Sequence, residues 1–166
     1  MLIMGIDPGI AISGYGVIAG KANDCSVIDY GVIRTASELE MPRRLKIIHQ
    51  SYVELIKEYK PDVVAIEELF FNKNAKTIIS VGQARGAAIL AAALSNIEVF
   101  EYTPLQVKQS VVGYGRADKL QIQQMIKIIF NLDKLPKPDD AADALAVALC
   151  HMSSYKLENF INKRGF

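Results

Sequence analysis

Residues 2–9 read Leu2-Ile3-Met4-Gly5-Ile6-Asp7-Pro8-Gly9, an apolar run that ends in an acid and a turn sequence. A short continuous apolar run of this kind predicts a buried strand, and Pro8-Gly9 predicts the tight turn that ends it. Two more strand-like segments follow at residues 14–19 and 25–34, separated by Gly, Asn and Asp residues. The beginning of the chain therefore predicts three consecutive strands in an antiparallel meander.

Helices alternate with strands in the rest of the chain. Apolar residues recur near the helical period over residues 38–59, which predicts an amphipathic helix. Residues 63–66 form a continuous apolar run, typical of a parallel strand covered on both faces. Residues 77–94 are helical by composition and rich in Gly and Ala, which favours close packing within the fold or against a second copy of the chain. Residues 97–102 alternate with period two and predict the last strand.

Three helices complete the predicted fold: a short one after Pro104, one over residues 117–130 and one that begins near Asp139. We therefore expect an α/β fold with a mixed five-stranded sheet, three antiparallel strands followed by parallel ones, flanked by helices. A length of 166 residues suits one compact domain. We assign residues 1–155 to this domain and residues 156–166 to a polar C-terminal tail.

Composition places the chain among soluble α/β proteins. Hydrophobic residues make up 51% and charged residues 22% of the sequence, and we find neither a signal peptide nor an uninterrupted apolar run of ~20 residues. We expect a cytoplasmic protein without a membrane segment. Cys25 and Cys150 have no CxxC spacing and no His cluster beside them, so we expect two reduced cysteines rather than a zinc site or a disulfide.

Basic residues gather in the middle of the chain although the net charge is only +1. Residues 72–137 contain nine Lys or Arg and four Asp or Glu, and nine minus four leaves +5. This pattern suits a polyanion bound beside an acidic, cation-holding centre, and an ordinary solvated surface is the alternative. The candidate DNA contacts in this segment are Lys73, Lys76, Arg85, Lys108, Arg116 and Lys119.

Four acids adjoin residues that we expect to be buried. Asp7 ends the first strand and, because side chains alternate, shares a face with Ile3 and Gly5. Glu67 follows the strand at residues 63–66, so both acids are expected at the carboxyl edge of the sheet, where open α/β sheets bind ligands. Asp140 and Asp143 are three residues apart, so on a helix they project from one side. Their place in a first helical turn also fits capping, with Asp139, and this alternative remains open from spacing alone.

Three separate segments thus bring carboxylates toward one place. Crowded like charges are unfavourable unless a cation neutralises them, and ligands that are all oxygen select magnesium or manganese. Two such ions about 4 Å apart can activate a water and stabilise the leaving oxygen of a phosphodiester. The four acids therefore predict metal-assisted phosphodiester hydrolysis.

Five motifs in order resemble the RuvC family of crossover-junction endodeoxyribonucleases over about residues 1–152. They are Gly5-Ile6-Asp7-Pro8-Gly9 with Gly14-Tyr15-Gly16, Ala65-Ile66-Glu67-Glu68-Leu69-Phe70, Gly82-Gln83-Ala84-Arg85-Gly86, Thr103-Pro104-Leu105-Gln106-Val107-Lys108-Gln109 and Asp140-Ala141-Ala142-Asp143-Ala144-Leu145-Ala146. Five ordered motifs are specific, whereas a lone strand with Asp-x-Gly is weak.

The resemblance implies a ribonuclease H-like nuclease domain that resolves four-way (Holliday) junctions in homologous recombination and DNA repair. It further implies a homodimer, paired symmetric nicks that leave 5′-phosphate ends, two Mg²⁺ ions per subunit that Mn²⁺ can replace, and the partners RuvA and RuvB. The family's four catalytic and metal-holding carboxylates match Asp7, Glu67, Asp140 and Asp143, although Asp139 offers a second register beside Asp140.

The resemblance also supplies roles for three of the other candidates. Lys108 and Lys119 match lysines near the scissile phosphate or the junction backbone. Phe70 matches an aromatic residue that stacks on bases at the opened junction centre, and the neighbouring Phe71 is an alternative. Without the resemblance these lysines read as solvated surface residues and these aromatics as core.

Two other functions compete with the nuclease. A sugar-kinase or actin-like ATPase also opens with a strand bearing Asp-x-Gly, but it needs two such domains and a second phosphate loop, for which this chain is too short. A non-catalytic junction-binding protein of the same fold predicts the loss of at least one metal-holding carboxylate. All four acids are present.

Overall fold

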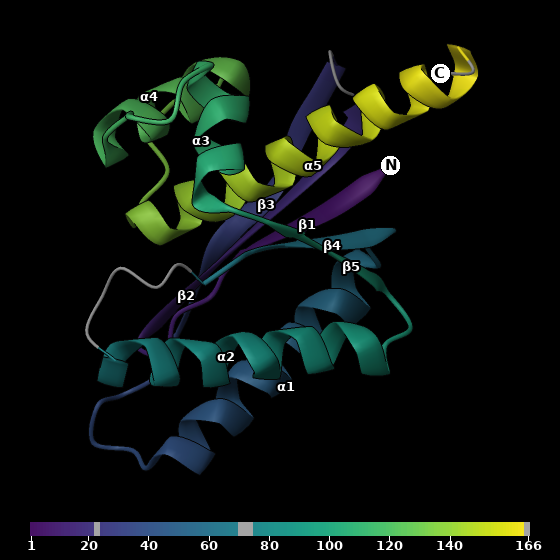
Figure 1. Ribbon diagram of the computed structural model, residues 1–166. Coiled ribbons are helices and arrows are strands. Elements are labelled where there is room, and N and C mark those ends of the chain that lie inside the picture. The colour runs from purple at the N-terminus through teal and green to yellow at the C-terminus, as the bar shows by residue number, and fades with distance from the viewer. Residues whose placement is uncertain (22–23, 70–74, 165–166) are drawn as a thin grey trace.

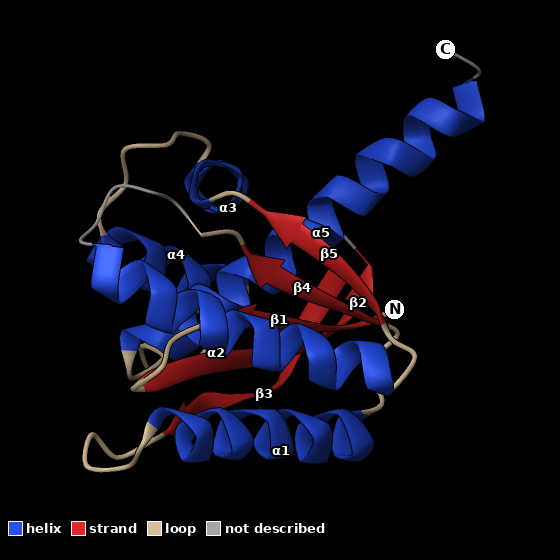
Figure 2. Cartoon of the chain, turned by 60° about the horizontal axis from the view of Figure 1, so that its bottom comes forward, coloured by secondary structure: helices blue, strands red, loops and turns tan. Residues whose placement is uncertain are grey.

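The computed structural model describes residues 1–21, 24–69 and 75–164, and their side chains except those of residues 75, 76 and 156–164. One five-stranded sheet organises the chain, with strand order β3-β2-β1-β4-β5 (Figures 1 and 2). The strands are β1 Leu2–Asp7, β2 Ile12–Lys21, β3 Asp24–Arg34, β4 Val63–Glu67 and β5 Glu98–Tyr102. The first three pair antiparallel, and β1-β4 and β4-β5 pair parallel, as the sequence predicts.

Helices cover both faces of this sheet (Figure 1). Helices α1 (Met41–Tyr59) and α2 (Ala75–Leu94) lie on one face. Helix α5 (Asp139–Arg164) crosses β1 and β2 on the other face, with α3 (Pro104–Val112) and α4 (Lys119–Ile129) packed against it. The helix α5 continues through residues 156–164, where we expected a polar tail.

Strand alternation divides the core between the two faces. Met4 and Ile6 of β1 pack with α1 and α2, whereas Ile3 packs with α5. In β4, Val64 and Ile66 face α1 and α2, whereas Ala65 faces α5. Because side chains alternate with period two, Asp7 and Glu67 belong to the α5 face of the sheet.

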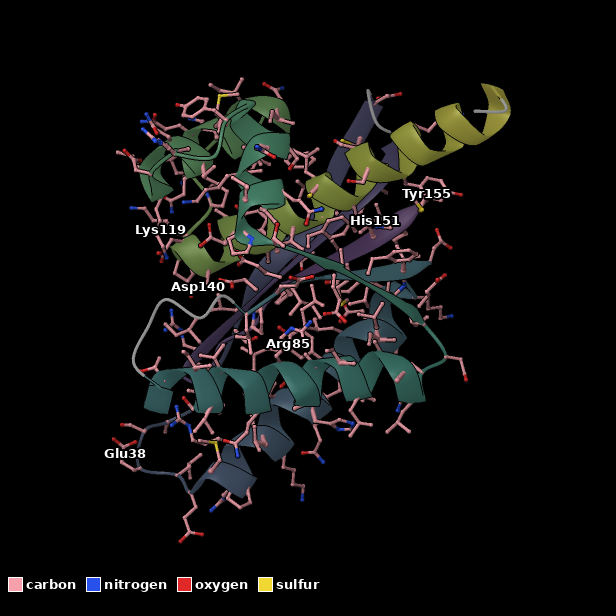
Figure 3. All side chains as sticks on the ribbon, viewed as in Figure 1. Glu38, Arg85, Lys119, Asp140, His151 and Tyr155 are labelled. Carbon is pink, nitrogen blue, oxygen red and sulfur yellow. The ribbon has the colours of Figure 1, made fainter. Side chains whose placement is uncertain are left out.

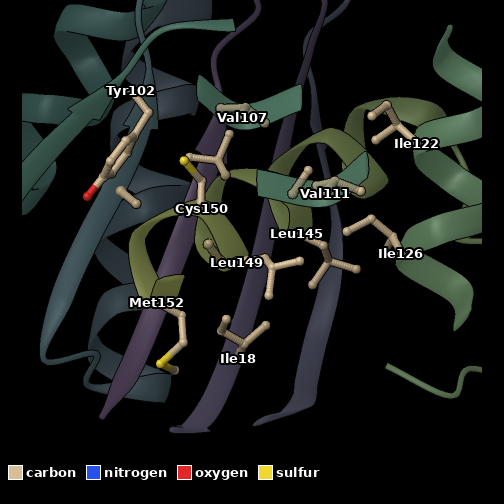
Figure 4. Close-up of a cluster of buried hydrophobic side chains, with 14 of the residues drawn as sticks. Ile18, Tyr102, Val107, Val111, Ile122, Ile126, Leu145, Leu149, Cys150 and Met152 are labelled. Carbon is tan, nitrogen blue, oxygen red and sulfur yellow. The ribbon is translucent and has the colours of Figure 1, made fainter. Parts of the chain in front are cut away.

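The core on the α5 face is built around the alanine-rich middle of that helix. Leu145 and Leu149 of α5 meet Ile18 of β2, Val111 of α3 and Ile126 of α4 (Figure 4). His151 is buried in the same layer, and its Nδ1 lies 2.8 Å from the Tyr102 hydroxyl oxygen. This histidine is therefore a core residue, and Cys150 beside it is a buried free thiol.

Glycines let α5 lie directly on the sheet. A Cβ added at Gly5 would overlap the Ala144 carbonyl oxygen, and one at Gly14 would overlap the Asp140 carbonyl oxygen. Contacts this close leave no room for a side chain. The two glycines therefore set the height of the acidic start of α5 above the ends of β1 and β2.

Helix α2 has one buried and one exposed face. Ala84, Ala88, Ala91 and Ala92 are buried in the α1 and α2 layer. Residues 77–94 are long and apolar enough to span a membrane by length and composition, a test that a core helix of a soluble protein also passes. The alanine face fits the close packing that the sequence predicts.

Candidate active site

Asp7 and Glu67 lie side by side at the carboxyl edge of the sheet. The parallel register pairs Ile6 with Ile66, so the next residues, the two acids, end neighbouring strands on the same face. Ligands of open α/β sheets bind at this edge of the strands. The structure therefore brings these two predicted residues together.

Helix α5 supplies the other two acids, and only one of them lines the cleft. Asp143 lines the same cleft as Asp7 and Glu67. Asp140 is not among the residues that line it, but its charge raises the pKa of Asp7. Its main chain lies against Gly14 at the edge of the site.

Burial and mutual repulsion raise the pKa values of three of these acids. Burial raises the pKa of Asp7 well above its usual value, and the charges of Glu67, Asp143 and Asp140 add to this. Burial and Asp143 raise the pKa of Glu67 to about 7. Burial also raises the pKa of Asp143. Carboxyls in this state favour a bound cation, which would remove the repulsion between them.

Two lysines face the acids from the outer helices. The Lys119 ammonium donates to Asp139 at 2.8 Å and lies 3.6 Å from an Asp143 carboxylate oxygen. Lys108 of α3 lines the cleft and lowers the pKa of Glu67 by its charge. Figure 3 shows Lys119 and Asp140 near the start of α5. Both predicted lysines therefore lie at the site.

The position of Lys119 is fixed by a capped helix. Asp118 precedes the first turn of α4, accepts from the backbone N–H of Gln121, and its own N–H donates to the Gln121 side chain. A lysine in the first turn opposes the helix dipole. Asp139 and Asp143 of α5 offset this unfavourable interaction, so the Lys119 ammonium is held beside the acids of the cleft.

Asp139 fits the capping and pairing role that its spacing left open. Its hydrogen bond with Lys119 lowers its pKa, and backbone N–H groups at residues 139 and 140 lower it further. Asp139 thus pairs with Lys119 at the start of α5 and, like Asp140, does not line the cleft, whereas Asp143 does.

The cleft has a volume of about 610 Å³ and a mixed lining. Helix α2 contributes a wall that the sequence did not point to, because its residues carry no distinctive chemistry. The lining comprises Asp7, Pro8, Glu67, Glu68, Leu69, Thr77, Ile78, Val81, Pro104, Val107, Lys108, Lys119, Ile122 and Asp143.

A divalent cation fits the donor set of this cleft. Among the described residues, no three Asp, Glu, His or Cys side chains stand close enough to enclose an ion without moving. The acids that act on one another's pKa values all offer oxygen, which is the donor that Mg²⁺ and Mn²⁺ prefer. Asp7, Glu67 and Asp143 would hold the ion, with Asp140 beside them.

Arg85, an expected DNA contact, is engaged with two other parts of the fold. Its side chain is 16% exposed, forms an ion pair with Glu101 of β5, and its Nε donates to the Glu67 carbonyl oxygen at 3.2 Å. Figure 3 shows Arg85 between α2 and the sheet. These two contacts tie Arg85 to the end of β4 and so position Glu67, while its expected contact with DNA stays a prediction.

The buried hydroxyl groups of Ser13 and Tyr52 hold the main chain at Asp7 in place, and the sequence analysis did not predict them. The Ser13 hydroxyl donates to the Asp7 carbonyl oxygen at 3.2 Å, and its oxygen lies 2.7 Å from the Tyr52 hydroxyl oxygen. Tyr52 in turn donates to the Gly14 carbonyl oxygen at 3.1 Å. In the sequence Tyr52 fits one of the apolar positions of α1. Its hydroxyl group was the one feature that could have indicated a buried hydrogen bond.

The remaining predicted contacts have no defined place at the site. Arg116 is exposed in the segment between α3 and α4. Phe70, its alternative Phe71 and Lys73 lie outside the described residues, as does the side chain of Lys76.

Comparison with known proteins identifies the family. The model of the family described as "Crossover junction endodeoxyribonuclease RuvC" matches residues 3–151. The chain belongs to the RuvC family. Its RuvC relatives include that of Alkaliphilus metalliredigens, 62% identical over 93% of this chain and 94% of the relative. The RuvC of Ruminiclostridium cellulolyticum is 58% identical over the full length of both chains.

Solved structures of RuvC agree with this fold. The Thermus thermophilus RuvC in complex with a Holliday junction substrate superposes with a TM-score of 0.90, at 36% identity over 95% of this chain and 96% of the other. The yeast mitochondrial Holliday junction resolvase Ydc2, at 13% identity, has a TM-score of 0.71 over 97% of this chain and 82% of the other, and shows the fold alone. The ribonuclease H-like architecture that the RuvC motifs implied is confirmed, and the ATPase alternative is set aside.

Proposed function

We propose that this chain is a metal-dependent endonuclease that resolves four-way DNA junctions by paired symmetric nicks, in recombination and repair. The observation that carries the proposal is the buried, mutually repelling set of carboxylates beside two lysines, in a chain of the RuvC family. A cleft built in this way suits a phosphodiester, because the acids attract cations and the lysines attract phosphate.

The metal site of the proposal consists of Asp7, Glu67, Asp140 and Asp143. RuvC-family nucleases are metal-dependent. We infer Mg²⁺, with Mn²⁺ as a substitute, because the donors are all carboxylate oxygens. The number of two ions per subunit rests on the family resemblance. When bound, such ions supply Lewis-acid activation of a water and stabilisation of the leaving 3′ oxygen.

The protein's own groups hold the substrate and its surroundings in place. Lys119 and Lys108 line the same cleft as the acids and can bind oxygens of the phosphate. Ser13 fixes the main chain of Asp7, and Arg85 fixes that of Glu67. The two strand acids therefore sit on a rigid edge, and the lysines lie on helices that face it.

The proposal includes a homodimer formed through α2. Ile79, Leu90 and Leu94 are exposed on this helix by 64%, 50% and 67%, and a Cβ added at Gly86 would meet no atom within 4 Å. These residues recur at helical spacing, so they form one small and apolar face. A two-fold symmetric junction suits such a dimer. RuvA and RuvB as partners and a cytoplasmic location rest on the family resemblance.

The test is cleavage of a synthetic mobile four-way junction in the presence of Mg²⁺. The wild-type chain should nick it symmetrically, and Asp7→Asn should bind it but lower the cleavage rate by at least ~10³-fold, because one metal-holding carboxylate is lost. Asp133→Asn, at an exposed position outside the cleft, is the matched control and should cut normally.

Each outcome decides between the functions. Binding without cutting by the wild-type chain, at every Mg²⁺ or Mn²⁺ concentration, would favour the non-catalytic junction-binding protein. Cleavage by Asp7→Asn at the wild-type rate would remove Asp7 from the site.

A further inference from the structure

A second depression opens beside the catalytic cleft, where three elements meet. It lies between the end of β3, the first turns of α4 and the segment that leads into α5. Its lining residues are Arg34, Lys119, Leu120, Gln123, Lys137, Pro138 and Asp139, and we call this set the basic groove. Three cations and one acid line it, so its formal charge is +2.

The charges of the basic groove are not balanced within the fold. Its one acid, Asp139, is engaged by Lys119 at 2.8 Å. Arg34 and Lys137 are both exposed, and in the described part of the chain neither forms an ion pair. Two cations held at one groove without a partner attract an anion, as crowded carboxylates attract a cation.

The walls of the groove are held in place by the fold. Gln123 donates to the Pro136 carbonyl oxygen at 3.3 Å, which ties the segment carrying Lys137 to α4. Arg34 is the last residue of β3, and the next residue, Thr35, donates its hydroxyl to the Ile10 carbonyl oxygen at 2.5 Å. The two cations therefore stand on anchored backbone rather than on a free loop.

The groove adjoins the catalytic cleft at Lys119. Lys119 lines both depressions, and Asp143 of the cleft lies 3.6 Å from the Lys119 ammonium. A strand whose phosphate occupies the cleft continues past Lys119 with a negative charge about every 3.4 Å of rise along that strand.

We propose that the basic groove binds the backbone of the cut strand on one side of the scissile phosphate, with Arg34 and Lys137 as its phosphate ligands. This inference rests on the proposed nuclease function and extends its DNA-binding surface beyond the metal site. An acidic segment of a partner protein would meet the same charges, but the shared Lys119 favours the strand that the cleft already holds. Contacts of this kind carry affinity and placement rather than sequence choice.

The experiment measures junction binding by the double variant Arg34→Gln with Lys137→Gln, in Ca²⁺ or EDTA so that no strand is cut. Each lost phosphate contact lowers the slope of log K against log salt by about 0.9. Two contacts per protomer make four in the proposed dimer, so the ratio of Kd at ~200 mM salt to Kd at ~50 mM salt should become about 10²-fold smaller. Lys46→Gln with Lys57→Gln, two exposed positions on α1 across the sheet, is the matched control and should keep the wild-type slope.

A neutral methylphosphonate, placed at single positions of the cut strand, locates the contact. In the wild-type chain it should weaken binding at positions within about three nucleotides on one side of the scissile phosphate. In the double variant the same substitution should have no further effect, because the partner cations are gone. An unchanged thermal midpoint of the double variant shows that it is folded.

The outcomes separate this proposal from the proposed function. If the wild-type chain cuts junctions and the double variant keeps the wild-type salt slope and methylphosphonate pattern, the groove does not bind the strand, and a protein partner becomes the explanation of its charge. If the wild-type chain does not cut, the nuclease function fails, while the salt slope of binding still tests the groove.

Discussion

Glu67 shows how burial raises the pKa of a carboxyl group in this cleft. Burial and the charge of Asp143 raise its pKa from 4.5 to about 7, whereas Lys108 and Lys119 pull the pKa down. The folded chain therefore holds this proton more tightly than the unfolded chain does. The free energy of unfolding must fall as the pH rises between these two values, because the folded state alone carries the proton there.

The prediction is that the metal-free protein loses stability between pH ~4.5 and ~7, by about 3 kcal/mol from Glu67. Glu67→Gln should remove the part of the decline that comes from Glu67, and the rest should remain because the pKa values of Asp7 and Asp143 are also raised. Added divalent cation should restore stability at neutral pH because it binds the ionised carboxylates. Denaturant unfolding in EDTA at several pH values measures both effects. Glu54→Gln, exposed on α1, should keep the wild-type decline, and stability that rises through this window would contradict the assignment.

At the scale of elements, strand periodicity predicted the strand half of the site. Alternation placed Asp7 with Ile3 and Gly5, and the structure puts that face against α5. Alternation along a strand is a local rule, so it can be read from the sequence. The height of α5 above the sheet depends on contacts such as Gly14 with Asp140, which join residues far apart in the sequence.

Arg85 illustrates the limit of reading charge from sequence. It lies in a basic segment, which favoured a DNA contact, yet it pairs with Glu101, sixteen residues later, and with the Glu67 carbonyl oxygen. Only the packing of α2 beside β5, which pairs with β4, brings these three residues together. Lys108 and Lys119, which the family motifs matched, line the cleft because their helices carry them there, and their contact with DNA stays a prediction.

We predict that Arg85→Gln raises the Mg²⁺ concentration needed for half-maximal cleavage, because the end of β4 loses its link to α2. Loss of hydrogen bonds to a charged group of this kind costs about 1–3 kcal/mol of unfolding free energy. Glu101→Gln should give a smaller change in the same direction, and the double variant should add little to Arg85→Gln. Cleavage rates measured over a range of Mg²⁺ concentrations give the half-maximal concentration for each variant.

Glu98→Gln, exposed on the same strand, is the control for Glu101→Gln and should leave the magnesium requirement unchanged. A loss of stability in Arg85→Gln without any change in magnesium requirement would make Arg85 a packing residue only.

At the scale of the whole molecule, the exposed face of α2 and the catalytic cleft share one helix. Thr77, Ile78 and Val81 line the cleft, whereas Ile79, Leu90 and Leu94 are exposed. A second copy bound to that face would therefore contact the helix that lines the cleft, and Arg85 ties the same helix to Glu67. Sequence composition predicted a packing or dimer helix here, but the direction of each face required the fold.

The last prediction is that Leu90→Glu converts the protein to a monomer. A buried charge without a partner is costly at an interface, whereas the same residue is harmless on a free surface. Ile28→Glu is the matched control, because Ile28 is 52% exposed on β3 and Leu90 is 50% exposed on α2. Light scattering should report a monomer for Leu90→Glu and a dimer for Ile28→Glu, with both chains folded.

Since two linked sites bind one junction with an avidity gain of about 10²–10⁴, the monomer should bind junctions at least ~10²-fold more weakly and lose the pairing of its nicks. A dimer that survives Leu90→Glu would move the interface to another face, and the alanine face of α2 would then serve only the packing of this one chain.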